Sequence, residues 1–164
     1  MHVVIVKVDL RKAYDRVNWL YLRLVLLQVG FHPEFVNWIM TCVQYVSFVV
    51  LINGERSPLF KPGKGLRQGC PVAPLLFILV VEGLRKSIAL ASSNGKLKGT
   101  RVGGNAIITH FLFVDDIILF SNGSRRDLYN FKDILSMFSE ATRIIIDAMK
   151  SIISSMNLEQ ESID

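Results

Sequence analysis

Two adjacent acidic residues, Asp115 and Asp116, lie between two apolar runs at residues 107–114 and 117–120. A carboxylate among apolar side chains is costly to bury unless a cation or hydrogen bonds compensate its charge. The alternative without a chemical role is a hairpin turn with acidic residues at its tip. Tight hairpin turns, however, favour Asn-Gly, Asp-Gly or Gly-Gly. The pattern therefore favours a cation site over a simple turn.

A third acid, Asp9, directly follows the apolar, β-branched run 3–8, which is typical of a central strand covered on both faces. A carboxylate at the end of such a strand is well placed to share a cation with a hairpin of the adjacent strand. The alternative is that Asp9 caps a following helix. Carboxylates together with substrate phosphates and water suit Mg²⁺. Two such ions about 4 Å apart stabilise the attacking and leaving oxygens of a phosphoryl displacement.

The elements that position these acids follow from periodicity and capping signals. Asn18 is expected to cap a helix that ends at Gly30. Ser124, with Asp127 three residues on, resembles a capping box at the start of another helix, and Asn53-Gly54 predicts a β-hairpin. Residues 92–104 have the composition of a polar linker, and no element is expected after Ser151. The pattern predicts strands at 3–8, 47–52, 57–60, 107–114, 117–120 and 144–146, and helices at 19–29, 33–43, 74–90 and 124–141.

This order of elements predicts an α+β fold with a mostly antiparallel sheet and helices packed on one face.

A length of 164 residues, with 51% hydrophobic and 20% charged residues, is that of one folded domain and excludes a disordered chain. The net charge of +5 gives a mild preference for polyanionic partners. Two cysteines are too few for a disulfide framework, which favours a reducing compartment. The longest apolar run, 71–81, is too short to span a membrane, so no membrane association is expected.

Three segments carry a family resemblance, and they occur in the expected order. Val-Asp-Leu-Arg-Lys-Ala-Tyr-Asp at 8–15, Gly-Leu-Arg-Gln-Gly-Cys-Pro at 65–71 and Phe-Val-Asp-Asp at 113–116 resemble catalytic motifs of reverse transcriptases. The resemblance is closest to the LINE-type (non-LTR) retrotransposons of plants, and it covers residues 4–151. It implies a reverse-transcriptase palm over 4–151, followed by a tail at 152–164 without a clear pattern. Asp9, Asp115 and Asp116 then match the catalytic, metal-binding carboxylates.

The same resemblance implies four residues that bind substrate. Tyr14 matches the aromatic residue under the incoming sugar that rejects a 2′-hydroxyl; packing at a helix start is the alternative. Gln68 and Gly69 match a loop that contacts nucleotide and template, in which glycine permits a close backbone approach; a plain helix-entry loop is the alternative. Lys150 matches a lysine near the pyrophosphate leaving group, and an ordinary exposed lysine is the alternative.

The function implied is that of an RNA-directed DNA polymerase that uses two Mg²⁺ ions, an RNA template, a DNA primer and deoxynucleotides. Because the chain begins near the first catalytic strand, the fingers and thumb segments are expected to belong to a parent polypeptide. An intracellular location is expected, in the nucleus for a retroelement. One alternative is a truncated, inactive retroelement remnant that binds nucleic acid or protein. Another is a nucleotide cyclase, against which the loop 67–71 argues because a cyclase contacts no template.

Overall fold

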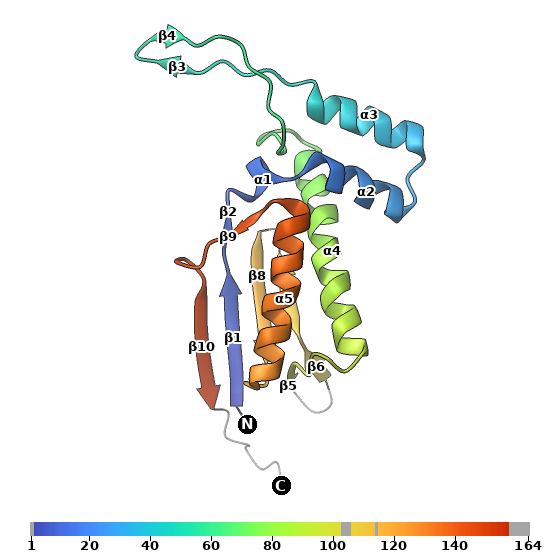
Figure 1. Cartoon of the computed structure of the whole chain (residues 1–164), viewed down its shortest axis with the longest axis vertical. Coiled ribbons are helices and arrows are strands. Elements are labelled where there is room, and N and C mark those ends of the chain that lie inside the picture. Colours follow the sequence, from blue (N-terminus) through green and yellow to red (C-terminus); the bar gives the residue numbers. More distant parts are fainter. Residues whose placement is uncertain (1, 103–105, 114, 158–164) are drawn as a thin grey trace.

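The main sheet has four antiparallel strands in the order β10-β1-β8-β7 (Figure 1). The computed structural model describes residues 2–102, 106–113 and 115–157. The strands are β1 (His2–Val8), β7 (His110–Phe113), β8 (Asp116–Ser121) and β10 (Ile152–Asn157). The central position predicted for this strand is confirmed, because β1 pairs with β8 on one side and with β10 on the other. The expectation that both its faces are covered is wrong, because Lys7 is exposed and Ile5 and Val6 are half-buried.

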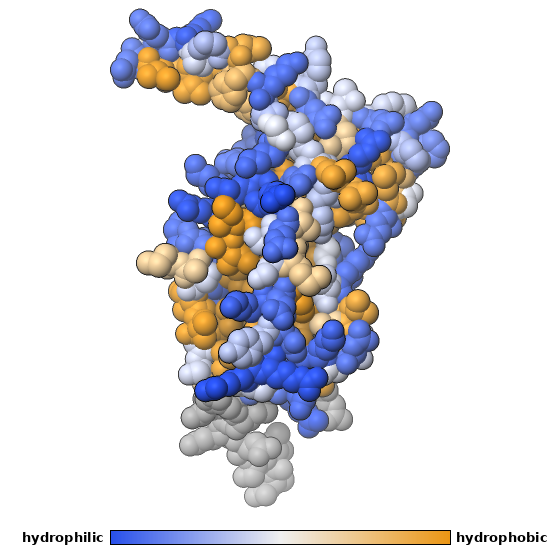
Figure 2. Space-filling view, viewed as in Figure 1, coloured by the Kyte–Doolittle hydropathy of each residue, from blue (hydrophilic) through white to orange (hydrophobic). Residues whose placement is uncertain are grey.

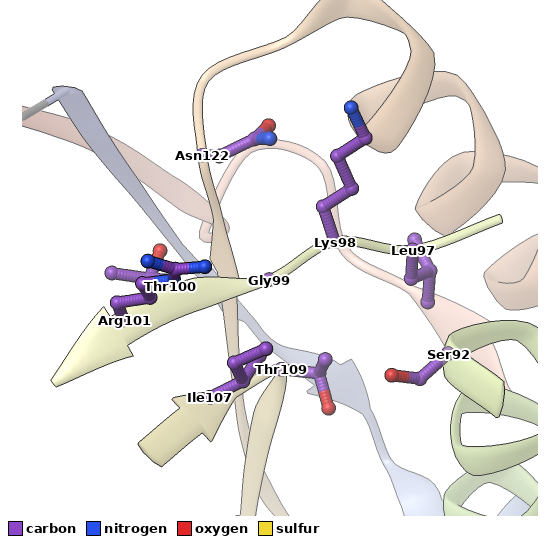
Figure 3. Close-up of a pocket in the computed structure, with 9 residues that line it drawn as sticks. All are labelled: Ser92, Leu97, Lys98, Gly99, Thr100, Arg101, Ile107, Thr109 and Asn122. Atoms are coloured by element: carbon purple, nitrogen blue, oxygen red, sulfur yellow. The ribbon is translucent and has the colours of Figure 1, made fainter. Parts of the chain in front are cut away.

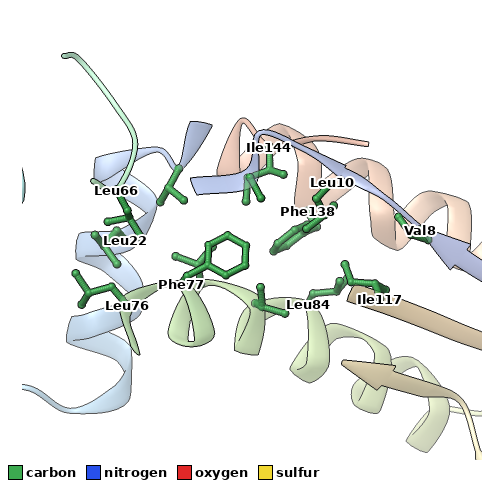
Figure 4. Close-up of a cluster of buried hydrophobic side chains, with 14 of the residues drawn as sticks. Val8, Leu10, Leu22, Leu66, Leu76, Phe77, Leu84, Ile117, Phe138 and Ile144 are labelled. Atoms are coloured by element: carbon green, nitrogen blue, oxygen red, sulfur yellow. The ribbon is translucent and has the colours of Figure 1, made fainter. Parts of the chain in front are cut away.

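Two long helices, α4 (Ala73–Ser93) and α5 (Arg125–Thr142), cover one face of this sheet (Figure 1). The burial of β8 alternates along the strand, with Ile117, Leu119 and Ser121 buried, as expected for a sheet covered on one face. In Figure 4, Phe77 of α4 lies in the middle of the core, which extends from Leu22 to Ile117. The predicted α+β fold with helices on one face is therefore confirmed.

Three further helices lie beyond the end of β1: α1 (Ala13–Arg16), α2 (Trp19–Val29) and α3 (Pro33–Gln44). The α2 boundaries agree with the prediction. The Asn18 side chain accepts a hydrogen bond from the Leu20 amide at 2.8 Å, and Gly30 ends the helix with φ of 102°. The short strands β2 (Leu10–Arg11) and β9 (Ile145–Ile146) pair beside α1 and continue the sheet toward these helices.

A β-ribbon projects from the body of the molecule after α3 (Figure 1). Strands β3 (Leu51–Ile52) and β4 (Glu55–Arg56) form the hairpin predicted at Asn53-Gly54, and a bridge between Phe48 and Phe60 extends it. The first strand is shorter than the predicted 47–52, and the second directly follows the turn at 55–56 instead of lying at 57–60. Hydrophobic side chains are exposed along it (Figure 2), with Leu51 and Ile52 more than 60% exposed.

Two sequence-based expectations about strands are wrong. The polar segment 92–104 contains β5 (Thr100–Val102), which pairs with β6 (Ala106–Ile108), so it is not simply a linker. The single strand expected at 107–114 is two strands, β6 and β7, which separate at Thr109. Both differences arise because β5, whose sequence alone gives little sign of a strand, pairs with β6 in a hairpin. Strand formation depends strongly on such context.

The buried carboxylate of Asp127 holds the segment that leads into β5. Its oxygens accept hydrogen bonds from the backbone amides of Lys98 and Gly99 at 3.1 to 3.3 Å. Its own amide donates to the Ser124 hydroxyl at 3.3 Å, which confirms the predicted cap of α5. One acid thus fastens the start of α5 to a segment 28 residues earlier.

The last described segment of the chain is a strand that the sequence pattern did not indicate. No element is expected after Ser151, yet residues 152–157 form β10, the edge strand beside β1. Two isoleucines followed by two serines carry weak alternation, and pairing with the central strand supplies the hydrogen bonds that the local pattern does not announce. Residues 158–164 lie outside the described part of the chain. Among the described residues, no helix is both long and apolar enough to cross a membrane.

Acid should weaken this fold through His110 before most carboxylates titrate. Burial and then the positive charge of Arg85 lower the pKa of His110 below its usual 6.5, and Glu82 opposes this. The unfolded chain therefore binds more protons between the lowered pKa and 6.5, so stability falls as pH drops through that window. Urea unfolding from pH 7.5 to 5 should show this loss in the wild type and a smaller one in His110→Gln. Equal slopes in the two proteins would contradict the prediction.

Candidate active site

The strand register brings the three predicted catalytic acids to the same end of the sheet. Val8, the last residue of β1, pairs with Ile117 of β8, so the next positions in that antiparallel register are Asp9 and Asp116. Asp116 also pairs with Phe113 across the β7–β8 hairpin, and Asp115 lies in the turn. Asp115 and Asp116 are exposed and Asp9 is half-buried, so all three carboxylates lie at the surface.

These positions decide between the alternatives for Asp9. The helix after it, α1, begins at Ala13 and follows Lys12, so Asp9 is not a helix cap. Asp115 and Asp116 do occupy a hairpin tip, although the poor turn sequence led the prediction to favour a cation site over a turn. Val114 between the two strands lies outside the described residues.

The donor set fits Mg²⁺ in kind, because carboxylate oxygens are the protein ligands that this ion takes. It also fits in strand position, because Asp9 directly follows Val8 and Asp116 directly precedes Ile117, the last pair of the β1–β8 ladder. Within the described ranges, however, no group of three or more His, Cys, Asp or Glu side chains is close enough to hold a metal ion. The metal-ligand roles of these acids therefore stay predictions.

The backbone of Asp9 is anchored by the turn that carries Lys150. The Asp9 amide donates to the Ser151 hydroxyl at 3.2 Å, and the Asp9 carbonyl accepts from the Asp147 amide at 2.9 Å. The Ser151 hydroxyl in turn donates to the Asp147 carbonyl at 2.8 Å. Lys150 is exposed and directly precedes Ser151, and its role near the leaving group stays a prediction.

Tyr14 lies in α1 and packs against the long helix below it. Its ring stacks on Phe77 of α4 with centroids 4.5 Å apart and planes at 17°. Burial raises the pKa of Tyr14, and the negative charge of Asp115 adds to the rise. Tyr14 therefore packs at a helix start, as the alternative expected, and it is also close enough to Asp115 for that charge to affect its pKa.

Backbone hydrogen bonds join the second motif to the first. The amide of Gly65 donates to the Val17 carbonyl at 2.8 Å, and the amide of Leu66 donates to the Tyr14 carbonyl at 2.7 Å. The Trp19 indole donates to the Gly65 carbonyl at 2.8 Å. Gly65 is also the position where this loop comes close to the backbone of the first motif.

A Cβ atom on Gly65 would lie 2.6 Å from the Asp15 carbonyl oxygen, and the φ of this residue is +92°. A Cβ atom on Gly69 would meet nothing within 4 Å, although its φ is also positive, at +83°. The expected approach of Gly69 to nucleotide and template stays a prediction. Both positions require glycine for conformation, and Gly65 requires it for space as well.

Gln68 lines a cavity of about 740 Å³ between the first motif, the ribbon and the second motif. Three basic side chains, Lys12, Lys64 and Arg67, line the same cavity, and Phe48 and Phe60 border it on the ribbon side. Sequence reasoning missed this basic group, because its members are separated by about 50 residues. A cavity with three cations suits a polyanionic ligand.

Another cavity, of about 510 Å³, lies at the opposite end of the sheet, where β5 begins. Figure 3 shows its lining, which includes Lys98, Arg101, Thr109 and Asn122. None of the predicted catalytic or substrate-binding residues borders it. This second cavity therefore has no part in the chemistry at the acidic end.

Solved structures of telomerase share this fold. Apo telomerase from Candida tropicalis, truncated from its C-terminal domain, superimposes with a TM-score of 0.72 over 97% of this chain and 32% of the telomerase chain, at 16% identity. Telomerase from Candida albicans in complex with a fragment of telomeric RNA gives 0.69 over 99% and 28%, at 14% identity. The chain therefore has the fold of the reverse-transcriptase palm.

The sequence comparisons give the family. A family model described as reverse transcriptase (RNA-dependent DNA polymerase) matches residues 1–163, so the chain belongs to the reverse transcriptase family. An uncharacterized mitochondrial protein of Arabidopsis thaliana is 45% identical over 76 residues, which are 46% of this chain and 61% of that protein. The Pol polyprotein of the Drosophila melanogaster type-2 element R2DM is 29% identical over 117 residues, 71% of this chain and 10% of that protein. The chain thus spans from a tenth to three fifths of these two relatives.

Proposed function

We propose that this chain is the palm of an RNA-directed DNA polymerase, which adds deoxynucleotides to a primer 3′-hydroxyl opposite an RNA template. The observation that supports this most is the β1–β8 register, which brings Asp9 and Asp116 to the same end of the sheet as the Asp115 turn, in a member of the reverse transcriptase family. Reverse transcriptases use divalent metal ions, and carboxylates are suitable ligands for them.

In this proposal Asp9 and Asp115 hold the metal ions, and Asp116 is the third acid. Two Mg²⁺ ions bound there would stabilise the attacking and leaving oxygens of an in-line displacement. The anchored backbone of Asp9 fixes where its carboxylate can reach, since both its amide and its carbonyl are hydrogen-bonded. Positioning of this kind is the main contribution of a protein to phosphoryl transfer.

Four other residues bind the substrates in this proposal. Tyr14, held by its stack on Phe77, lies under the incoming sugar. Gln68, which lines the basic cavity, and the adjacent Gly69 contact the nucleotide and the template. The three cations of this cavity outnumber its Asp15 carboxylate and suit the phosphates. Lys150 neutralises charge on the pyrophosphate as it leaves.

A chimaeric polymerase tests this function. Residues 2–157, which include β10, replace the matching segment of the R2DM Pol polyprotein, and primer extension on an RNA template is measured with Mg²⁺. We expect template-directed deoxynucleotide incorporation that requires the metal. A folded chimaera that binds primer and template but extends nothing would favour the alternative, an inactive remnant that only binds nucleic acid.

Tyr14→Val in this chimaera should change the choice of sugar. A smaller side chain opens space for a 2′-hydroxyl, so ribonucleotide incorporation should rise while deoxynucleotide incorporation falls modestly. The kcat/KM preference for deoxynucleotides should shrink about tenfold or more, where tenfold corresponds to about 1.4 kcal/mol. Tyr14→Phe keeps the ring and should keep the preference. An equal fall with both substrates would mean that Tyr14 only packs on Phe77.

A further inference from the structure

Lys7 is the one lysine or arginine in β1, a strand that is otherwise apolar apart from its first residue. It pairs with Ile118 of β8 on one side and with Ile152 of β10 on the other. A lysine at this position has aliphatic neighbours on both flanking strands, and its ammonium group reaches past them toward solvent. The direction in which that group turns therefore depends on charges near the end of the strand.

The ammonium group of Lys7 turns toward the acidic end of the sheet. Its Nζ lies 3.4 Å from Oδ1 of Asp116, and the two side chains are 52% and 58% exposed. Asp116 is the diagonal neighbour of Lys7 across the strand pair, two positions from Ile118. The ion pair thus joins the strand that leads to Asp9 with the strand that begins at Asp116.

We infer that Lys7 is a positioning residue for the proposed metal site, a role that rests on the proposed function. Its ammonium group holds the Asp116 carboxylate over β1 and offsets one of the three negative charges. Asp9 and Asp115 are then left as the principal metal ligands. The proposal makes Asp116 an acid whose orientation is set by a neighbouring strand rather than by the metal alone.

A positioning residue at a metal site changes metal affinity, whereas an ordinary surface ion pair changes only the stability of the fold. An exposed pair contributes about 1 kcal/mol or less to stability, so losing it should barely move the unfolding transition. A positive charge a few ångströms from a bound divalent ion, in contrast, weakens the binding of that ion directly. Metal affinity, measured at constant stability, therefore separates the two roles.

The test titrates Mn²⁺ into the complete 164-residue chain and follows free Mn²⁺ by electron paramagnetic resonance. Lys7→Met, which keeps an unbranched apolar chain, should bind Mn²⁺ about three- to tenfold more tightly than the wild type. Lys7→Arg keeps the charge and should stay within about twofold. Lys132→Met removes an exposed lysine from α5, away from the acids, and is the matched control, with unchanged affinity expected.

Asp116→Asn completes a double-mutant cycle. If Lys7 acts by holding Asp116, the effect of Lys7→Met should be clearly smaller in the Asp116→Asn protein. Equal effects in both backgrounds would contradict positioning and leave only long-range charge. If Asp9→Asn weakens Mn²⁺ binding but Lys7→Met changes nothing, the inference about Lys7 is wrong while the proposed metal site stands. If the wild type shows no binding that depends on Asp9, both are wrong.

Discussion

Asp115→Asn in the chimaeric polymerase should lower the incorporation of deoxynucleotides and ribonucleotides alike, by at least about 100-fold in kcat/KM. Asparagine has the size of aspartate but lacks its charge, so the change removes a metal ligand that serves either sugar. Because Asp115 is exposed in the hairpin turn, its replacement should leave the unfolding transition within about 0.5 kcal/mol of the wild type.

Asp133→Asn provides the matched control for this prediction. Asp133 is an exposed acid on α5, and its replacement makes the same change in charge and size away from the acidic end of the sheet. Single-turnover extension rates should be unchanged in this variant. An Asp115→Asn enzyme that retained more than about a third of the wild-type rate would remove Asp115 from the catalytic residues.

Gly65→Ala should destabilise the complete chain by about 3 to 5 kcal/mol. A Cβ atom there would lie 2.6 Å from the Asp15 carbonyl oxygen and 2.8 Å from the carbonyl carbon, and backbone atoms cannot move aside as a flexible side chain can. The positive φ of +92° adds conformational strain for any L-residue with a side chain. Urea unfolding followed by circular dichroism measures the loss.

Gly69→Ala separates the steric clash with Asp15 from the conformational strain of a positive φ. Its φ of +83° is close to that of Gly65, but the added Cβ would meet nothing within 4 Å. This variant should therefore cost about 1 to 2 kcal/mol, the conformational part alone. Similar losses in both variants would show that the contact between the second motif and Asp15 contributes little.

Local signals predicted most elements of this fold correctly. The caps at Asn18 and Ser124 and the hairpin at Asn53-Gly54 act within a few residues, so the sequence displays them directly. Strand β5 was missed because its own pattern is weak, although its partner β6 follows closely in the chain. Strand β10 was missed because its partner lies far away in the chain. β10 is formed by pairing with β1, about 150 residues away, and its own Ile-Ile-Ser-Ser pattern gives little indication of a strand.

The candidate site shows the same division. Asp9, Asp115 and Asp116 were found because acids beside apolar strands are costly without a compensating partner. The Lys7–Asp116 ion pair depends on the register of two strands. The basic cavity depends on how three separate segments fold together. The contact of Gly65 with Asp15 could not be predicted either, because a motif shows that a glycine is needed but not which neighbour requires it.

The claim that Asp9 and Asp115 hold metal ions can be tested with crystals of the complete chain. The crystals are soaked in Mn²⁺, and anomalous scattering is recorded at the manganese edge. We expect a manganese ion coordinated by carboxylate oxygens of Asp9 and Asp115 at about 2.2 Å, and no manganese at these residues in crystals of Asp115→Asn. An Asp9 carboxylate more than about 8 Å from those of both Asp115 and Asp116, or manganese bound only elsewhere, would contradict it, because shared ions about 4 Å apart require a closer approach.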